Sequence, residues 1–499
     1  MIAARPARAA SGYSSMSSAS PLDHDDLSTV SEHGMQRFAA ERVPSLPALV
    51  LLWSSGEPER VGEACLLPSG QPWGPARVFG RGEARAEDPH RRLHLTRQSA
   101  AVESTPPLSN RHVSRIQLIV RGHESGRLAI ENVGRCTAYK NGERVDNAQL
   151  EPGDLLQLGG QLLFLCVLRA GWRRLPAPRE HGFGEPDRHG LVGESDAIWR
   201  LRQQISAAAA DNHHVLLLGE SGTGKELVAC AIHAESEYRG RPLIARNAAT
   251  LPEGLIDAEL FGSARNYPNA GMPERPGLIG QAHDSSLFLD EFGELTRALQ
   301  VHLLRVLDAG EYQRLGESIA RNSRFRLIAA TNRPADALRE DVLARFATRI
   351  RLPRLADRRE DIPLLFRHAL ALATRTRTRS ASSSQHRDHG PPVGLIERLM
   401  RHELPGNVRD LSALAARYAR DPDYEAWEDV WCSPPLDSDA AAGDGERSPS
   451  SQEIEDCLKR HAWVKEKAWR ELGLSSRHVL ARLMRKHGIE GLPERELDS

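Results

Sequence analysis

A short apolar run followed by a glycine-rich turn and a lysine constrains the fold of this chain more than any other feature. The run is Val215–Leu218, the turn is Gly219–Gly224, and Lys225 opens a stretch with helical patterning. A strand, a tight turn and a helix in this order surround an anion with backbone N–H groups and the positive end of a helix dipole. The sequence therefore predicts a phosphate-binding loop. The residues expected to contact a nucleotide here are Gly219, Glu220, Ser221, Gly222, Thr223, Gly224, Lys225 and Glu226.

Two further apolar runs end in polar side chains. Ser286–Glu291 ends in two carboxylates, of which Asp290 suits Mg²⁺ and Glu291 suits the orientation of an attacking water. Arg324–Asn332 ends in Thr331 and Asn332. Because ligands bind at the carboxyl edge of parallel strands, these runs and the glycine-rich turn predict one ATP site in an α/β sheet. The alternative is a glycine-rich turn that binds nothing.

Length and composition indicate several domains in a cytoplasmic protein. A chain of 499 residues exceeds what one hydrophobic core usually supports. The six cysteines show no C-x-x-C or metal-ligand spacing, which favours reduced thiols in a cytosol. No apolar run approaches the ~18 residues of a membrane span. The net charge of −1 does not identify a partner.

Composition shifts divide the chain into six segments. We expect a disordered tail at 1–45, with an organelle transit peptide as the alternative. Short alternating runs such as Ala48–Trp53, Ile116–Val120 and Leu162–Leu168 predict a β-sandwich. The expected segments after the tail are a β-sandwich at 46–170, a linker at 171–188, an α/β domain at 189–421, a flexible linker at 422–451 and a helical domain at 452–490.

The central segment resembles a known family. The motifs are GESGTGKE at 219–226, NAATL at 247–251, ELFG at 259–262, LFLDE at 287–291 and LPGNVRDL at 404–411. They resemble the AAA+ domain of bacterial enhancer-binding proteins, the ATPases that activate sigma-54 RNA polymerase. The resemblance covers about residues 189–421. GESGTGKE is the usual form of the loop in that family, which accounts for Glu226 where the general motif has Ser or Thr.

The resemblance implies roles for individual residues. It implies that Asn247 holds the catalytic Glu291 until release, and that Arg339 and Arg345 are arginine fingers supplied to a neighbouring subunit. It implies further that Thr331 and Asn332 form a first sensor and that Arg409 is the second. Sites shared between subunits imply a homo-oligomeric ring, expected to be a hexamer, with a helical lid, ATP and Mg²⁺.

The β-rich segment resembles a forkhead-associated (FHA) domain, which reads phosphothreonine. The matching residues are Gly80-Arg81, Ser109-Asn110-Arg111-His112, Asn141-Gly142 and Gly153-Asp154. The resemblance implies that Arg81 and Ser109 contact phosphate, that Asn110 binds the peptide backbone and that His112 braces the loop. Cys136 stands where many members carry a peptide-binding Asn. A sandwich used only for packing or dimerisation is the alternative.

The C-terminal segment is strongly basic. Residues 458–487 hold nine Lys or Arg against two acids, which is the charge pattern of nucleic-acid binding. A helix, a turn at Gly473 and a second helix from about Ser476 predict a helix-turn-helix. It resembles the Fis-type module of enhancer-binding proteins. The residues expected at double-stranded DNA are Ser476, Arg477, His478 and Arg482. A solvated basic helix pair is the alternative.

Two stretches depart from the family pattern. Where the family has a GAFTGA loop that contacts sigma-54, this chain reads Asn266-Tyr267-Pro268-Asn269-Ala270-Gly271. Because Pro268 replaces the aromatic tip and fixes φ, we expect a stiffer loop and weak or absent activation of sigma-54 polymerase. The alternative is that Tyr267 substitutes for the aromatic residue. The second stretch, Thr374–Arg379, alternates threonine and arginine, and we expect it to be a disordered insertion on a solvated surface, with DNA contact as the alternative.

Together these features predict a multidomain protein with an N-terminal FHA-like β-sandwich, a central AAA+ P-loop ATPase and an all-α helix-turn-helix. The predicted function is ATP-dependent, DNA-binding regulation of transcription with phosphothreonine sensing. Two other classes stay open. One is a DNA-binding regulator whose AAA+ ring serves only oligomerisation, and the other is a phosphopeptide-binding scaffold.

Overall fold

The structure is a computed structural model, and it places two separate units in the chain, residues 1–435 and 436–499. Each unit is described by itself. The described residues are 45–83, 91–97, 103–170, 181–251, 255–378, 390–427, 451–461, 463, 468, 471, 472 and 484. The predicted tail and most of both predicted linkers lie outside them.

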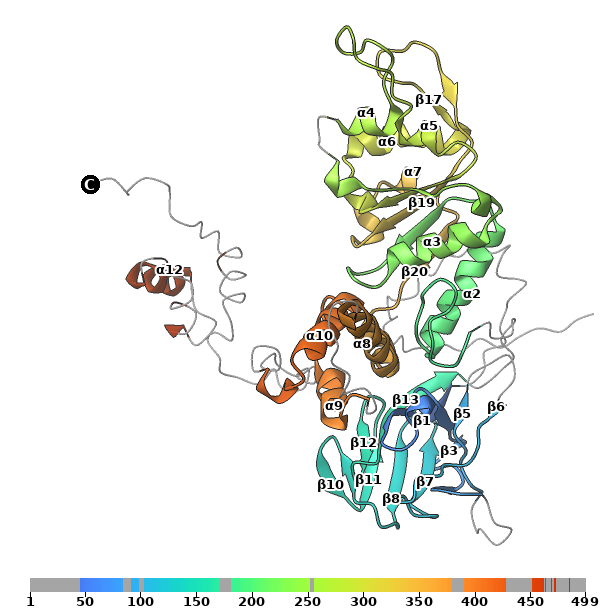
Figure 1. Cartoon of the computed structure of the whole chain (residues 1–499), viewed down its shortest axis with the longest axis vertical. Helices are drawn as coiled ribbons and strands as arrows, with labels where there is room; N and C mark the ends of the chain where they lie inside the picture. The colour runs from blue at the N-terminus through green and yellow to red at the C-terminus, as the bar shows by residue number, and fades with distance from the viewer. Residues whose placement is uncertain are drawn as a thin grey trace, which may run out of the picture. The chain divides into compact units, whose positions relative to one another are not determined.

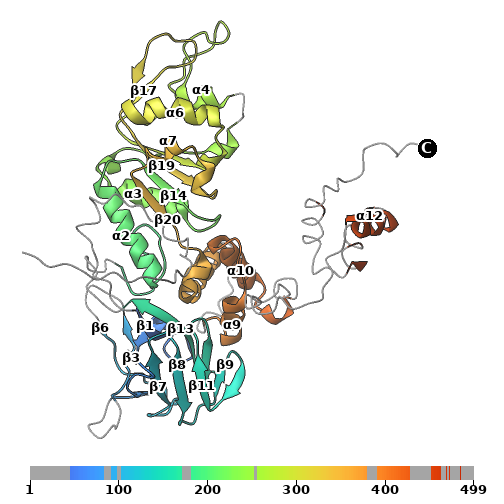
Figure 2. The same cartoon turned by 180° about the vertical axis from the view of Figure 1, so that it is seen from behind.

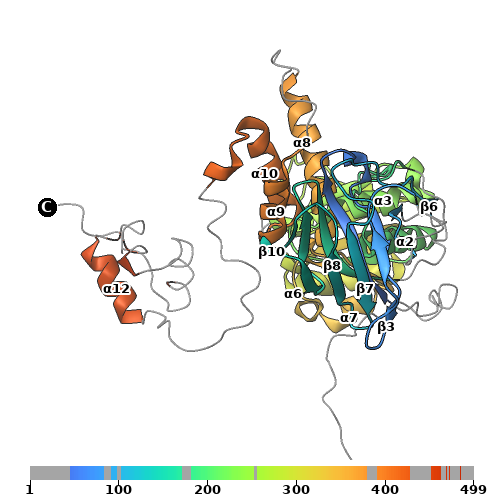
Figure 3. The same cartoon turned by 90° about the horizontal axis from the view of Figure 1, so that it is seen from below.

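Two mostly antiparallel sheets form the N-terminal region, so the predicted β-rich architecture is confirmed (Figure 1). One sheet has the order β10-β9-β12-β13-β1-β2-β5-β6, and the other has the order β11-β8-β7-β3 with β4 on β7. Figure 3 shows β7 and β8 side by side, and their register pairs Val120 with Ile130. The inward faces of the two sheets share one apolar core that includes Leu51, Leu118 and Phe164.

The strands of this region extend from residue 45 to residue 170. The three strands named from the sequence correspond to β1, β7 and β13. The bounds are β1 Ser45–Ser54, β2 Ala64–Leu66, β3 Ser69–Gly70, β4 Arg77–Phe79, β5 Thr96–Arg97, β6 Glu103–Ser104, β7 Leu118–His123, β8 Leu128–Asn132, β9 Ala138–Lys140, β10 Glu143–Val145, β11 Asn147–Leu150, β12 Leu155–Leu158 and β13 Leu162–Ala170.

Strand β13 is apolar on both faces. Phe164 and Cys166 point into the sandwich core, whereas Leu163 and Leu165 belong to a second core. That second core also contains residues of three helices, such as Phe366 and Leu399. The helices are α8 (Ile362–Thr378), α9 (Val393–Arg401) and α10 (Val408–Arg420). Alternating side chains of a strand point to opposite faces, so a continuous apolar run places a strand between two packed layers. The sandwich and the helices therefore share buried apolar surface.

A buried ion pair accompanies this shared core. Arg169 on β13 contacts Glu360 at 3.1 Å, and both side chains are less than 10 % exposed. Arg169 also donates to the Glu194 carbonyl at 3.2 Å, and Asp361 accepts from the backbone N–H groups of Glu194 and Ser195. Removal of one partner from such a pair leaves a buried charge without compensation.

The central domain is a five-stranded parallel sheet with helices on both faces. The strand order is β15-β16-β19-β14-β20, and all four pairings are parallel. Successive side chains of each strand point to opposite faces of the sheet. Leu216 and Leu287 pack into the core on one face, whereas Leu217 and Phe288 pack into the core on the other. The sheet bounds are β14 Val215–Leu218, β15 Ile244–Asn247, β16 Ser286–Asp290, β19 Arg326–Thr331 and β20 Thr348–Arg351.

Each face of the sheet has its own helices, and Figure 2 shows α2 and α3 beside β14 and β20. The helices of this face are α2 Asp196–Ala210 and α3 Lys225–Glu235. The helices of the other face are α4 Ile256–Phe261, α5 Gly277–Gln281, α6 Arg297–Ala309 and α7 Glu340–Leu343. Thr296 caps α6 by accepting from the Leu299 N–H, and Gly310 ends it with φ +71°. A hairpin of β17 Glu311–Tyr312 and β18 Arg321–Asn322 follows α6.

Helices after β20 form the lid. Their bounds are η6 Leu355–Asp361, α8 Ile362–Thr378, α9 Val393–Arg401 and α10 Val408–Arg420. The expected disordered insertion at Thr374–Arg379 is wrong for residues 374–378, because α8 continues to Thr378. The alternating threonine–arginine pattern concealed this helix, since arginine is a good helix former and the Thr374 hydroxyl bonds back to the carbonyls of Leu370 and Ala371. Residues 379–389 lie outside the described residues.

The C-terminal unit contains one described helix, α12 Ser451–Arg460. Apolar residues of this unit form a small core, to which α12 contributes Ile454, Cys457 and Leu458. The other two members are Ala468 and Met484. The turn and the second helix predicted for residues 473–486 lie outside the described residues, apart from Met484.

Among the helices that the structure describes, none has the length and apolar character needed to cross a bilayer. The five cysteines of the described part are all free thiols, and four of them are buried.

Candidate nucleotide-binding site

The glycine-rich loop joins β14 to α3 as expected. Gly222 and Gly224 have φ values of +78° and +101°, which side chains rarely adopt, and α3 begins at Lys225. The buried Lys225 ammonium donates to the carbonyls of Gly219 at 2.9 Å and Glu220 at 3.2 Å. Burial lowers the pKa of Lys225, while the carboxylates of Glu291 and Asp290 act in the opposite direction. The lysine ammonium is therefore held by the loop itself and experiences the charge of both acids.

The ends of four strands meet at one edge of the sheet, and three of them carry polar residues. In the strand register, Asn247 lies opposite Asp290 and Leu218 lies opposite Thr331. The Gly219 N–H donates to the Thr331 carbonyl at 3.2 Å, which attaches the loop to β19. The three strand ends predicted from the sequence to form one site are thus adjacent.

The two carboxylates after β16 have different surroundings. Asp290 Oδ1 accepts from the Glu291 N–H at 2.9 Å, and no donor among the described residues bonds Oδ2. Glu291 is partly exposed and has a φ of +50°, which turns its side chain away from the strand direction. An oxygen ligand without a donor suits Mg²⁺, and a carboxylate with access to solvent suits a water.

The other predicted residues at this edge of the sheet are Asn247, Thr331 and Asn332, which differ in hydrogen bonding and in burial. Asn247 Oδ1 accepts from the Ala249 N–H at 2.8 Å and caps the short helix η3 (Ala248–Thr250). Its described bond therefore goes to its own loop and not to Glu291. Thr331 is fully buried, its hydroxyl accepts from the Arg333 N–H, and the neighbouring Asn332 is exposed.

The lid reaches the phosphate-binding loop through the turn before α10. Arg409 Nη1 donates to the Ser221 hydroxyl at 2.9 Å, so this predicted sensor does lie at the loop. Asn407 was missed as a site residue. Its Nδ2 donates to Glu220 Oε2 and the Ser221 carbonyl, both at 3.1 Å, and its Oδ1 accepts from the Leu355 N–H at 2.7 Å. Its place within the LPGNVRDL motif was the available signal.

The two predicted arginine fingers lie outside this cluster, at the chain surface. Arg339 forms an ion pair with Asp341 at 2.7 Å. Arg345 pairs with Asp308, with Nη2 at 3.0 Å from Oδ2. Exposed pairs of this kind contribute little to stability, so each arginine can exchange its acid for another anion.

The loop at Asn266–Gly271, expected to stand in place of GAFTGA, has a defined conformation. The Asn266 N–H donates to the Met272 carbonyl at 2.8 Å, and Asn266 Oδ1 accepts from the Gly271 N–H at 2.9 Å. Tyr267 packs against Gly316 in the loop between β17 and β18, where an added Cβ would lie 2.4 Å from the ring. The aromatic side chain is therefore held against a neighbouring loop and is 39 % exposed.

The predicted phosphopeptide residues lie in loops of the sandwich. The Arg81 Nε atom is buried and has no hydrogen-bond partner among the described residues. Ser109 is exposed, but its hydroxyl donates to Glu57. Asn110 is buried, and its Nδ2 donates to Ser55 and Gln161. Cys136 is also buried and its thiol donates to the His112 carbonyl, so Cys136 braces the loop instead of facing a peptide.

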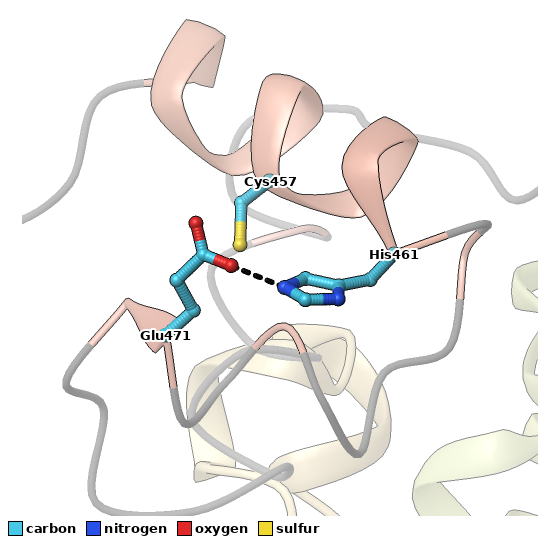
Figure 4. A group of neighbouring side chains, drawn as sticks. All are labelled: Cys457, His461 and Glu471. Carbon is cyan, nitrogen blue, oxygen red and sulfur yellow. Dashed lines mark hydrogen bonds and ion pairs between the residues drawn. The ribbon is translucent and has the colours of Figure 1, made fainter.

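The four predicted DNA-contacting residues, from Ser476 to Arg482, lie outside the described residues. Nearby, Cys457, His461 and Glu471 bring three potential metal ligands within 4.8 Å of one another (Figure 4). Each already has a partner. His461 bonds Glu471, which also pairs with Arg460, and the Cys457 thiol donates to the Ala468 carbonyl at 3.5 Å. These contacts account for the three side chains, of which Cys457 belongs to the small core and Glu471 is exposed.

A known domain family matches the part of the chain that contains the phosphate-binding loop and the strand ends. Residues 191–352 match the family model of the sigma-54 interaction domain. The Nif-specific regulatory protein of Azotobacter vinelandii is 35% identical over 314 residues, which are 59% of this chain and 58% of that protein. The transcriptional regulator VasH of Vibrio cholerae is 40% identical over 234 residues, covering 45% and 42%. The chain spans about half the length of the curated relatives it matches.

Among solved structures, NtrX from Brucella abortus in complex with ATP is 28% identical, with a TM-score of 0.41 over 61% of this chain and 70% of that one. Residues 191–352 are thus similar to a sigma-54 interaction domain, and the chain is similar over about half its length to curated regulatory proteins. The matched family model ends at residue 352, so it covers neither the sandwich nor the C-terminal residues.

Proposed function

We propose that this protein is an ATP-hydrolysing, DNA-binding regulator of transcription. The observation that carries the proposal is the convergence of Lys225, Asp290 and Glu291 at one sheet edge, with Arg409 and Asn407 reaching the same loop from the lid. Lys225 and the loop N–H groups bind the phosphates. Glu291 accepts a proton from the attacking water, and a neighbouring subunit supplies Arg339 and Arg345.

Asp290 is the residue that would hold Mg²⁺, since its Oδ2 has no described donor. When bound, the ion would neutralise phosphate charge. Lys225 has to leave the carbonyls of Gly219 and Glu220 to reach a phosphate. Nucleotide binding therefore exchanges two internal hydrogen bonds of the lysine for charge-assisted ones.

The basic C-terminal segment supports DNA anchoring. Removal of residues 452–499 is expected to abolish site-specific DNA binding and to leave ATP hydrolysis intact, because the residues proposed for the two activities lie in separate units. In the full chain, Arg477→Ala and Arg482→Ala should each lower affinity and reduce the salt slope by about 1 per lost phosphate contact. Footprinting at several salt concentrations measures both quantities. An unchanged footprint for the truncated protein would show that DNA is bound elsewhere.

The altered loop at Asn266–Gly271 predicts weak activation of sigma-54 polymerase. In transcription with purified sigma-54 polymerase and ATP, we expect little open complex from the natural chain despite ATP hydrolysis. Tyr267 is held against Gly316, so it is not presented at the loop tip. The variant with both Pro268→Phe and Asn269→Thr should raise open-complex formation. Strong activation by the natural chain, lost in Tyr267→Ala but kept in Met272→Ala, would instead establish Tyr267 as the contact residue.

We further propose that the sandwich binds a phosphothreonine peptide. The buried Arg81 Nε atom, which has no described partner, supports this second activity. A regulator whose ring serves only oligomerisation stays the alternative if ATP is bound and not hydrolysed.

A further inference from the structure

The sandwich loops contain a carboxylate that is bound as an external anion would be. Glu57 lies between β1 and the short helix η1 (Pro58–Arg60) and is only 9% exposed. Its Oε1 accepts from the Ser109 N–H at 2.8 Å and from the Ser109 hydroxyl. Both donors of Ser109 therefore point at one oxygen of Glu57.

The other oxygen of this carboxylate is held from the opposite side. Glu57 Oε2 accepts from Arg60 Nη1 at 3.1 Å, and the Glu57 N–H donates to the Ser54 hydroxyl at 3.1 Å. Arg60 is fixed in turn by Glu63 at 2.8 Å and by Thr105 at 2.9 Å. A backbone N–H, a hydroxyl and a guanidinium are the donors that proteins use for oxyanions.

We propose that Glu57 is an internal ligand of the anion site at Ser109, and that a phosphothreonine side chain enters this site by displacing it. The inference rests on the proposed phosphopeptide binding, in which Ser109 and Arg81 contact the phosphate. Arg81 keeps its Nε for an incoming ligand, whereas the donors of Ser109 are taken. One donor group of the proposed site, the buried Arg81 Nε, therefore lacks a partner among the described residues, whereas both donors of Ser109 are occupied by Glu57.

The charge of Glu57 makes this arrangement selective. A phosphothreonine carries about −1.5 to −2 charges at neutral pH. While Glu57 stays at Ser109, the phosphate meets a like charge at close range, which weakens binding. Only a peptide with enough additional contacts can displace the carboxylate. The natural site should therefore reject isolated phosphothreonine motifs.

Neutralising Glu57 tests the proposal in the full chain. Fluorescence anisotropy would be measured with a labelled pool of degenerate phosphothreonine peptides, the same pool without phosphate, and inorganic phosphate as competitor. The variants are Glu57→Gln, which removes the charge, Glu57→Asp, which keeps it, and Arg81→Ala, both alone and combined with Glu57→Gln. Arg60 retains Glu63 as its partner in each variant. If the glutamine variant does not fold, Glu57→Ala supplies a second uncharged side chain.

We expect the glutamine variant to bind the phosphorylated pool about tenfold more tightly or better, with no gain for the unphosphorylated pool. The aspartate variant should resemble the natural chain, and Arg81→Ala should remove the gain. Equal, measurable affinity of the natural and glutamine proteins would overturn the role of Glu57 and leave phosphopeptide binding intact. Absence of binding to both would overturn the two proposals together. A gain that extends to the unphosphorylated pool would also reject an anion site.

Discussion

Glu291→Gln should bind ATP and lose about 100-fold or more of its hydrolysis rate, because an amide cannot accept the proton of the attacking water. Glu291 follows β16 with a φ of +50°, and its side chain has access to solvent beside Asp290 and Lys225. Glutamine keeps the size of the side chain, so the fold and the phosphate contacts should persist. Nucleotide affinity by fluorescence and phosphate release under saturating ATP measure the two effects separately.

Glu294→Gln is the matched control for this experiment. Glu294 lies one turn further along the chain, is exposed and pairs with Arg333 at 2.5 Å. Its neutralisation removes a carboxylate near the site without touching the proposed base, so the rate should stay within about twofold of the natural one. Equal losses in both variants would mean that general charge near the loop, and not the position of Glu291, controls hydrolysis.

Arg339→Ala and Arg345→Ala should each lower turnover by about 10³-fold at concentrations that allow oligomers to form. In the isolated chain both arginines pair with their own acids, Asp341 and Asp308, and the proposed function assigns both to the site of a neighbouring subunit. Arg305→Ala removes an exposed arginine of α6 and serves as the control. The specific activity of the natural protein should rise with protein concentration.

Mixing two inactive proteins tests the sharing of sites directly. A Glu291→Gln subunit still carries both arginines, and an Arg345→Ala subunit still carries its glutamate. If sites form between subunits, the mixture should recover a substantial part of the activity that neither protein has alone. No recovery, with oligomers present by light scattering, would place the whole catalytic machinery within one chain.

The central domain was predictable because three of its five strands end at predicted site residues. The apolar runs before Gly219, Asp290 and Thr331 indicated the strands, and the parallel order brings their ends to one edge. The lid contact of Arg409 followed from family resemblance alone. Asn407 was missed because its role depends on a turn with φ +54° that faces both Leu355 and Ser221, which residue type and spacing do not encode.

The sandwich was predictable as a β-rich region but not in the use of its polar residues. Glu57 lies 52 positions before Ser109, and nothing in the local sequence indicates that they meet. The two-faced packing of β13 had a signal, since Leu162–Leu168 is apolar without interruption, whereas a half-buried strand alternates. Its partner could not be identified, because the lid helices that cover it lie about 200 residues later in the chain.

The shared core of β13 and the lid limits where this protein can be cut or recombined. A fragment without the sandwich would expose Phe366, Leu399 and their neighbours, which are almost completely buried in the whole chain. Exposed apolar surface of this kind promotes aggregation. The sandwich therefore cannot be exchanged independently of the helices that pack against it. Any transfer to another ATPase would also require the matching lid surface, so these two parts should have diversified together.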